Sequence, residues 1–407
     1  MRSRPKRIGL LGNFGIGNFG NDASLEAMLL LLRQTQPNAE LTCVCTNPEK
    51  VQRDFQIAAV PLSWPGSRLL SKPANWIYAI KTVSRLDMLI VPGTGILTDY
   101  CAPPFGMPYT IFRWCLAARM CGTRIGMVSV GAGPLHHPIS RWFIKSTASM
   151  AQYRSFRNKF SKEFLANLGV NTKNDPIYPD IAFGLPSPSS PIKETPEVER
   201  LTVAVGAMLY EGWRGHTRTD DRVYEEHVGR ILEFVLWLLD QNHRVLLITG
   251  DEKDWQAVDD VRKAVAAKRP SLPAERLIAE PAHSGHDVMR QIADADIVTA
   301  SRYHHLVFAL KLGKPTISTG YSEYHAELLA EMGLGAFCQH SEHINVELLI
   351  TQFAKLLSNK SYHEMAIHDA MATNQKRIAR QDSLFTSQFL EASPYERSES
   401  VLPDRTG

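Results

Sequence analysis

The chain has 407 residues, of which 44% are hydrophobic and 21% are charged. This composition is too apolar for a disordered chain, and the length favours two domains over one. The 45 Lys and Arg residues against 42 Asp and Glu residues leave a net charge of +3, which excludes a globally basic nucleic-acid binder, so any anion site must be local.

Short apolar runs alternate with longer amphipathic stretches along the chain. Several runs are too apolar to have one face in water, so the alternation predicts parallel α/β sheets. The predicted strands are residues 7–12, 41–45, 86–91, 124–130, 201–207, 244–249, 297–300 and 316–319. The predicted helices are residues 23–34, 109–120, 161–168, 222–240, 254–267, 288–293, 306–312 and 362–390.

One segment, Leu185–Pro196, is rich in proline and serine and interrupts this rhythm. Such a composition is typical of a linker between domains. We therefore expect two α/β domains with a ligand-binding cleft between them. The predicted boundaries are 1–186 for the N-terminal domain, 187–199 for the linker, 200–391 for the C-terminal domain and 392–407 for a flexible tail.

Hydrophobic runs in this chain are shorter than the roughly 18 residues that a membrane span requires, and none resembles a signal peptide. The six cysteines form no C-x-x-C pair and are expected to be reduced thiols. The sequence thus predicts a cytoplasmic protein without a transmembrane segment. It leaves open a peripheral membrane contact and does not define the oligomeric state.

The first candidate motif is a glycine-rich loop, Gly12–Asp22, between a strand and a helix. A helix start offers free N–H groups to anions, and the spacing G-x-G-x-x-G occurs at Gly15, Gly17 and Gly20. A nicotinamide site would also need an acid after the second strand, where Cys45 is followed by Thr46 and Asn47. A dinucleotide site is therefore disfavoured, and Asn21 is expected to cap the helix.

Two further glycine turns follow apolar strands, at the edge where open α/β sheets bind ligands. The first, Pro92–Asp99, ends in a carboxylate that either acts as an acid or base or caps the next segment. The second, Gly131–Pro134, is better explained as a tight loop than as a ligand contact.

Arg302 and His304 lie between a strand and a helix expected to begin near Leu306. A guanidinium and an imidazole at such a junction suit a phosphate or a carboxylate, and burying them without an anion would be costly. His305 is expected to pack inward instead. The segment Asp251–Asp254 is interpreted as a helix start with solvated charges, and the remaining histidines lack a set of metal ligands.

In this order, the motifs resemble those of the polysaccharide pyruvyl transferase family over residues 8–335. Arg302 and His304, followed by Gly313 and Pro315, match the family's Arg-x-His and Gly-x-Pro pattern. The family's Gly-Asn-x-Gly-Asp-Glu loop is matched with an additional asparagine, Asn21, and with Ala23 in place of glutamate. The other matching segments are Gly93–Asp99, Gly131–Pro134, Arg157–Ser161 with Asn158 in place of an acid, Leu168–Gly169 and Pro179–Asp180.

The resemblance implies a glycosyltransferase-B-like fold of two Rossmann-like domains facing across a cleft. It implies a transferase that moves pyruvate from phosphoenolpyruvate to a sugar as a ketal and releases phosphate, with no cofactor and no metal. The acceptor would be a polysaccharide or its lipid-linked oligosaccharide precursor.

The resemblance also assigns roles to individual residues. His304 and Arg302 would bind the phosphoenolpyruvate anion, with His304 assisting phosphate departure, and Asp99 would activate the acceptor. Arg157 is either a second anion clamp or part of a salt bridge. The remaining substrate-binding candidates are Gly17, Asn18, Gly20, Asp22 and Gly95.

Two other functions fit the same architecture. The first is a sugar-nucleotide glycosyltransferase or epimerase, which would also use an anion site at helix starts. The second is a non-catalytic protein that binds a glycan or a nucleotide, because a fold does not fix a function.

Overall fold

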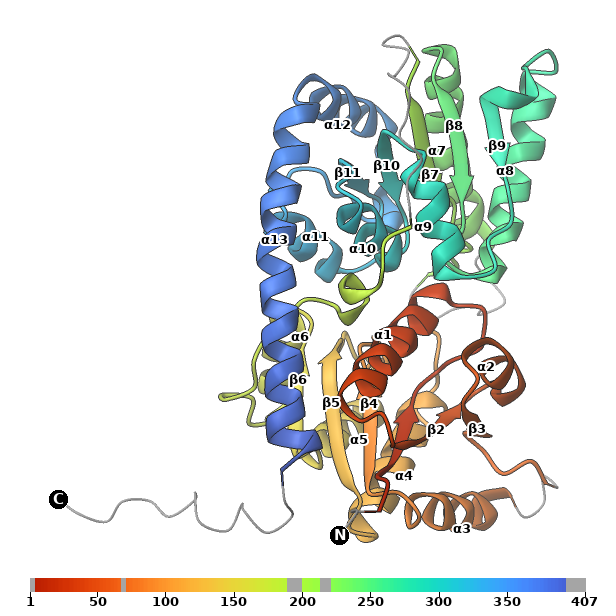
Figure 1. Cartoon of the computed structure of the whole chain (residues 1–407). Helices are drawn as coiled ribbons and strands as arrows, with labels where there is room; N and C mark the ends of the chain where they lie inside the picture. The colour runs from red at the N-terminus through yellow and green to blue at the C-terminus, as the bar shows by residue number, and fades with distance from the viewer. Residues whose placement is uncertain (1–3, 67–70, 189–199, 213–220, 393–407) are drawn as a thin grey trace.

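The computed structural model describes residues 4–66, 71–188, 200–212 and 221–392. The predicted linker, 187–199, and the predicted tail, 392–407, lie almost entirely outside these residues. The chain forms two parallel sheets, one above the other in Figure 1. This arrangement agrees with the prediction of two Rossmann-like domains.

The first sheet has six strands in the order β3-β2-β1-β4-β5-β6, and all of its pairings are parallel. Its strands are β1 (Arg7–Leu11), β2 (Glu40–Cys45), β3 (Ala58–Pro61), β4 (Met88–Pro92), β5 (Arg124–Val130) and β6 (Tyr153–Phe156).

The second sheet has five parallel strands in the order β11-β10-β7-β8-β9. Its strands are β7 (Thr202–Gly206), β8 (Arg244–Ile248), β9 (Leu277–Ala279), β10 (Ile297–Ala300) and β11 (Thr316–Ser318). All eight predicted strands are present, and β3, β6 and β9 were not predicted.

The helices of the first half are α1 (Phe19–Thr35), α2 (Pro48–Phe55), α3 (Ser71–Val83), α4 (Met107–Met120), α5 (Pro138–Ser149) and α6 (Lys159–Asn167). Those of the second half are α7 (Asp221–Asp240), α8 (Trp255–Lys268), α9 (Gly285–Ala293), α10 (Tyr303–Lys311), α11 (Glu323–Glu331), α12 (Val346–Ser358) and α13 (Lys360–Phe385). Five of them, α2, α3, α5, α11 and α12, were not predicted.

The first sheet is buried on both faces, as the apolar character of its strands requires. Along β4, Leu89 and Val91 pack in one cluster with α3, α4 and α5, while Met88 and Ile90 pack in another with α1. Alternate residues of a strand point to opposite faces, so one apolar run supplies two cores. Each fully buried side chain of this size contributes about 1.5–3 kcal/mol.

Helix α13, blue in Figure 1, runs past the second sheet and returns to the first. Near its end, the Gln381 Oε1 accepts hydrogen bonds from the Ser129 and Ser155 hydroxyls, at 2.8 and 3.1 Å. The Phe385 and Phe389 rings then pack on Tyr153. Although the sequence assigned all of 200–391 to the second domain, these last residues complete the core of the first.

The two domains meet at the carboxyl ends of β1 and β8. The Phe19 amide donates to the Gly250 carbonyl at 3.1 Å, and the Glu252 amide donates to the Gly17 carbonyl at 2.9 Å. From helix α11, the Glu327 carboxylate accepts from two backbone amides in the first turn of α6. These contacts fix the loops that surround the candidate site.

Candidate active site

A cavity of about 740 Å³ lies between the two domains. Its walls come from the loops and first helical turns that follow β1, β4, β5, β6, β7, β8, β10 and β11, at the carboxyl edge of both sheets. Open α/β sheets bind ligands at this edge. Of the predicted site residues, the cavity is lined by Asn18, Gly20, Gly95, Arg157, Arg302 and His304.

His304 lies in the first turn of α10, which begins at Tyr303, three residues earlier than expected. Its Nε2 is buried, has no hydrogen-bond partner among the described residues, and lies 3.8 Å from the Asp180 Oδ2. Burial lowers the pKa of His304 to about 4 and Arg157 adds to this effect, although Asp180 opposes it. The imidazole is therefore neutral at pH 7.

Gly20, at the start of α1, allows His304 to occupy this position. A Cβ at residue 20 would overlap the His304 ring. The glycine of the N-terminal loop thus shapes the cavity by making room for a side chain of the other domain.

We expect Gly20→Ala to lower the catalytic rate by roughly 10²-fold, since displacing a group at a reacting centre by about 1 Å can have that effect. The methyl group must displace either the His304 ring or the α1 backbone. Steady-state transfer rates and melting temperatures would be measured beside Gly229→Ala in α7, where an added methyl meets open space. If folded Gly20→Ala is as active as Gly229→Ala, this role of Gly20 is wrong.

Arg302 is the N-cap residue of α10 and pairs with Asp254, a residue that sequence reasoning placed in solvent. The guanidinium Nε and Nη2 donate to the two carboxylate oxygens at 3.0 and 2.6 Å. Asp254 is fully buried and also accepts from the Leu209 and Gly250 amides. The interpretation of Asp254 as a solvated charge is therefore wrong, and the protein itself supplies an anion for Arg302.

Arg157 is buried beside the Tyr303 and Tyr324 rings, with its guanidinium carbon 4.2 and 5.1 Å from their centroids. Its Nη1 lies 3.4 Å from the Asp180 Oδ2, and its buried Nε has no partner among the described residues. A Cβ at Gly131 would lie 2.6 Å from that Nε. Arg157 therefore forms the salt bridge that was one alternative. Because it also lines the cavity, the other alternative, an anion clamp, stays a prediction.

Asp180 is a site residue that was not among the predicted ones. It is fully buried, caps a short 3-10 helix (Ile181–Gly184) through the Ala182 amide, and lies near both Arg157 and His304. The Pro179–Asp180 pair was the signal in the sequence, because it belongs to the family pattern.

The N-terminal loop divides into residues at the cavity and residues that hold the loop. Asn18, and not Asn21 as predicted, caps α1 by accepting from the Asn21 amide at 3.0 Å, and it donates to Asp251. The Asp22 carboxylate accepts from the Gly15 amide at 2.9 Å, and burial raises its pKa to about 6. Gly17 has a φ of 88°, which favours glycine. Neither Gly17 nor Asp22 is among the described residues that line the cavity.

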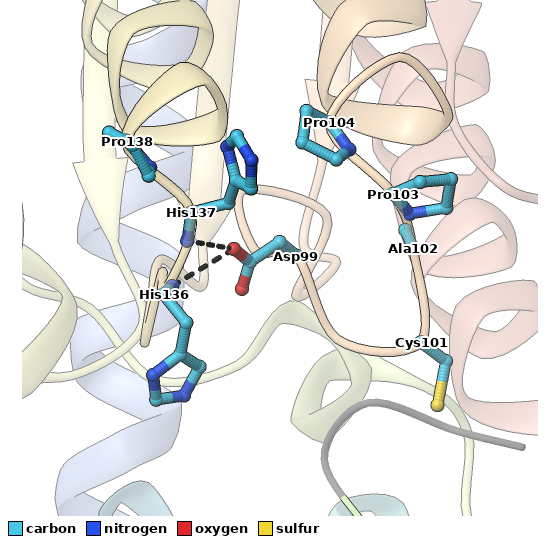
Figure 2. Close-up of a pocket in the computed structure, with 8 residues that line it drawn as sticks. All are labelled: Asp99, Cys101, Ala102, Pro103, Pro104, His136, His137 and Pro138. Carbon is cyan, nitrogen blue, oxygen red and sulfur yellow. Dashed lines mark hydrogen bonds between the residues drawn. The ribbon is translucent and has the colours of Figure 1, made fainter. Parts of the chain in front are cut away.

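Asp99 lines a second, smaller cavity of about 420 Å³. Figure 2 shows its carboxylate directed at the chain before α5, where the Oδ2 accepts from the His136 and His137 amides at 2.9 Å each. Cys101, Ala102 and Pro103 line both cavities. Asp99 is thus adjacent to the larger cavity without lining it.

The chain has a glycosyltransferase-B-like fold, as its likeness to solved structures shows. A putative UDP-N-acetylglucosamine 2-epimerase from Listeria monocytogenes aligns with a TM-score of 0.62 at 16% identity, covering 96% of this chain and 98% of that chain. The UDP-GlcNAc 2-epimerase from Neisseria meningitidis, bound to UDP-GlcNAc, aligns with a TM-score of 0.61 at 12% identity, covering 95% of this chain and 100% of that chain. A glycosyltransferase from Rickettsia africae aligns with a TM-score of 0.62 at 11% identity, covering 96% of this chain and 100% of that chain.

The family of this chain is shown by its sequence. The model of the polysaccharide pyruvyl transferase family matches residues 18–323, and the chain belongs to this family. This range includes every predicted site residue except Gly17. No curated protein matches the chain in sequence.

Proposed function

We propose that the protein transfers the pyruvyl group of phosphoenolpyruvate to two hydroxyls of a sugar, as a ketal, and releases phosphate. The acceptor is a polysaccharide or its lipid-linked precursor. The observation that carries the proposal is His304, which lines the cavity together with Arg157 and Arg302 in a chain of this family. Its buried Nε2 has no hydrogen-bond partner among the described residues.

The proposed reaction begins with protonation of C3, which leaves cationic character at C2. A sugar hydroxyl oxygen forms a bond to C2 and loses its proton. The bond between C2 and the phosphate oxygen then breaks, and a second hydroxyl closes the ketal. One proton ends on C3 and one leaves with phosphate, so the step consumes phosphoenolpyruvate and a diol and needs no oxidant.

The charges in the cavity suit a donor with a phosphate and a carboxylate. Asp254 occupies the Arg302 Nε and Nη2, which leaves Nη1 for the ligand, and Arg157 adds a second positive charge at the cavity wall. A phosphate dianion beside His304 would raise the pKa of the imidazole from about 4, because an opposite charge favours the protonated form. His304 would thereby gain the proton that it gives to the departing phosphate.

Asp99 as the acceptor base requires that the sugar extend from the larger cavity into the smaller one. The shared wall of Cys101, Ala102 and Pro103 is consistent with such a path. In this arrangement the donor occupies the larger cavity, and the acceptor enters past the loops before α4 and α5.

A sugar-nucleotide glycosyltransferase or epimerase is the second candidate, favoured by the similar fold of the Neisseria meningitidis enzyme bound to UDP-GlcNAc. That likeness extends to the fold alone at 12% identity. The two candidates differ in the donor, and donor binding separates them.

We expect phosphoenolpyruvate to raise the melting temperature and NAD to leave it unchanged. Ligand at 100 times its Kd stabilises the native state by about 2.7 kcal/mol. Thermal unfolding would be followed with phosphoenolpyruvate, UDP-GlcNAc and NAD, and the product analysed by mass spectrometry for the added pyruvate ketal. Stabilisation by UDP-GlcNAc alone would favour the second candidate, and stabilisation by NAD alone would reject both.

A further inference from the structure

Large apolar side chains are exposed on and beside the helices that cover one face of the first sheet. Phe105 is 68% exposed and Trp142 is 56% exposed. Helix α4 packs between α3 and α5, so the three helices form one layer. We call the outward surface of these helices and of the turns beside them the outer helical face. Its exposed apolar residues are Ile77, Met120, Ile139 and Trp142 on the helices, Trp64 in the loop after β3 and Phe105 in the turn before α4.

The charged side chains on α3, α4 and α5 are all positive. Helices α3, α4 and α5 contain no Asp or Glu. Between residues 56 and 162 the only acids are Asp87, which pairs with Arg4 and Arg7, and Asp99, which is buried. The exposed cations of the outer helical face are Lys81, Arg85, Arg119, Arg141 and Lys145.

Exposed aromatic residues of this surface pack against further aromatic rings of α4 and α5. Phe112 lies 5.2 Å from Trp142, and Phe143 lies 5.8 Å from Phe105, measured between ring centroids. The Trp76 indole donates to the Tyr109 hydroxyl at 3.0 Å, which ties α3 to α4. The protruding side chains are therefore held on rigid elements.

The outer helical face borders the smaller cavity. Phe105 follows Pro104, and Ile139 follows Pro138, and both prolines line that cavity (Figure 2). Whatever covers this surface therefore lies beside the entrance proposed for the acceptor. Among the described residues, no helix has both the length and the apolar character to cross a membrane.

We propose that the outer helical face docks on an anionic phospholipid surface, where a lipid-linked acceptor would be found. Only the identity of that acceptor rests on the proposed function. Tryptophan and phenylalanine insert at the level of the lipid headgroups, and lysine and arginine near them are attracted to anionic lipids. A symmetric dimer through this face is disfavoured, because it would bring cations of both copies together without acids.

The test is sedimentation of the full chain with vesicles of phosphatidylglycerol and phosphatidylcholine, beside vesicles of phosphatidylcholine alone. The protein is expected to bind the first and not the second, and to dissociate at high salt. Arg141→Gln with Lys145→Gln should lower the partition coefficient roughly 30-fold, from about 1 kcal/mol for each cation. The matched control, Lys376→Gln with Arg380→Gln, removes two exposed cations of α13 at the same spacing and should bind like the unmodified protein.

The apolar contribution has its own pair of variants. Phe105→Ser with Trp142→Ser should weaken binding to the anionic vesicles, while Tyr362→Ser with Met365→Ser, at residues 63% and 60% exposed on α13, should not. Equal binding by test and control variants, or no binding by the unmodified protein, overturns the proposal. So does a dimer in light scattering that Phe105→Ser with Trp142→Ser converts to a monomer.

These vesicles contain neither donor nor acceptor, so docking and transfer can fail separately. Vesicle binding without pyruvyl transfer would reject the proposed function and retain the docking surface. Transfer to a short soluble acceptor without vesicle binding would support the proposed function and reject the docking surface.

Discussion

His304→Ala is expected to lower the kcat of pyruvyl transfer by about 10²–10⁴-fold, the usual range for loss of a general acid. The variant removes the buried Nε2, which has no hydrogen-bond partner among the described residues and lies 3.8 Å from the Asp180 Oδ2. His304→Gln, which keeps a hydrogen-bond donor but cannot titrate, should restore affinity for phosphoenolpyruvate more than turnover. Single-turnover transfer and equilibrium binding would be measured on both variants.

A control for the loss of a buried histidine is His363→Ala. His363 is buried, packs against Phe337 and does not line the cavity. It should lower the melting temperature and leave kcat unchanged. Transfer by folded His304→Ala within about threefold of the unmodified rate would contradict general-acid help, which is worth at least about 10²-fold.

Asp254→Ala is expected to destabilise the protein by about 3–5 kcal/mol, because it leaves the largely buried Arg302 charge without its partner. The same change also removes the acceptor of two backbone amides, those of Leu209 and Gly250. Urea unfolding would give the free energy. Asp240→Ala, which breaks the exposed pair with Arg269, should leave stability nearly unchanged.

Phosphoenolpyruvate distinguishes a ligand-facing Arg302 from a purely structural one. In Asp254→Ala the freed guanidinium should gain the phosphate as a partner, so the ligand should raise the melting temperature more than in the unmodified protein. A smaller rise in the variant would indicate that Asp254 positions Arg302 for the ligand. Unfolding free energies equal to those of Asp240→Ala would contradict the buried ion pair.

The central strands could be predicted because they are runs of consecutive apolar residues, which indicate a strand buried on both faces of a sheet. The unpredicted strands are short and lie at or beside sheet edges, where polar residues are tolerated. In β6, for example, Arg154 interrupts the apolar pattern, and its charge is balanced by Asp175 from a later loop. Helix α5 buries one face, but Ser140, Thr147 and Ala148 on that face are polar or small. The exposed Ile139 and Trp142 blur the apolar periodicity further, so the sequence pattern did not indicate a helix.

The site residues that lie at a strand end or a helix start could be predicted from the sequence. Their partners, which come from distant segments of the chain, could not. Arg302 and His304 stand at a strand end and a helix start, which the sequence shows directly. Their partners, Asp254 and Asp180, come from segments about 50 and 120 residues away, and only the pairing of the sheets brings them close. Asp254 was misread because a carboxylate before a helix usually caps it in solvent.

The return of α13 sets an order of events while the chain is being made. The last strand of the first sheet ends at Phe156, yet the side chains that cover its β5–β6 side, among them Gln381 and Phe389, belong to the last described helical turns. The N-terminal domain therefore emerges from the ribosome with part of its core open to water, and it closes only after the second domain has been synthesised. For this chain, maturation of the first half waits for the C-terminus.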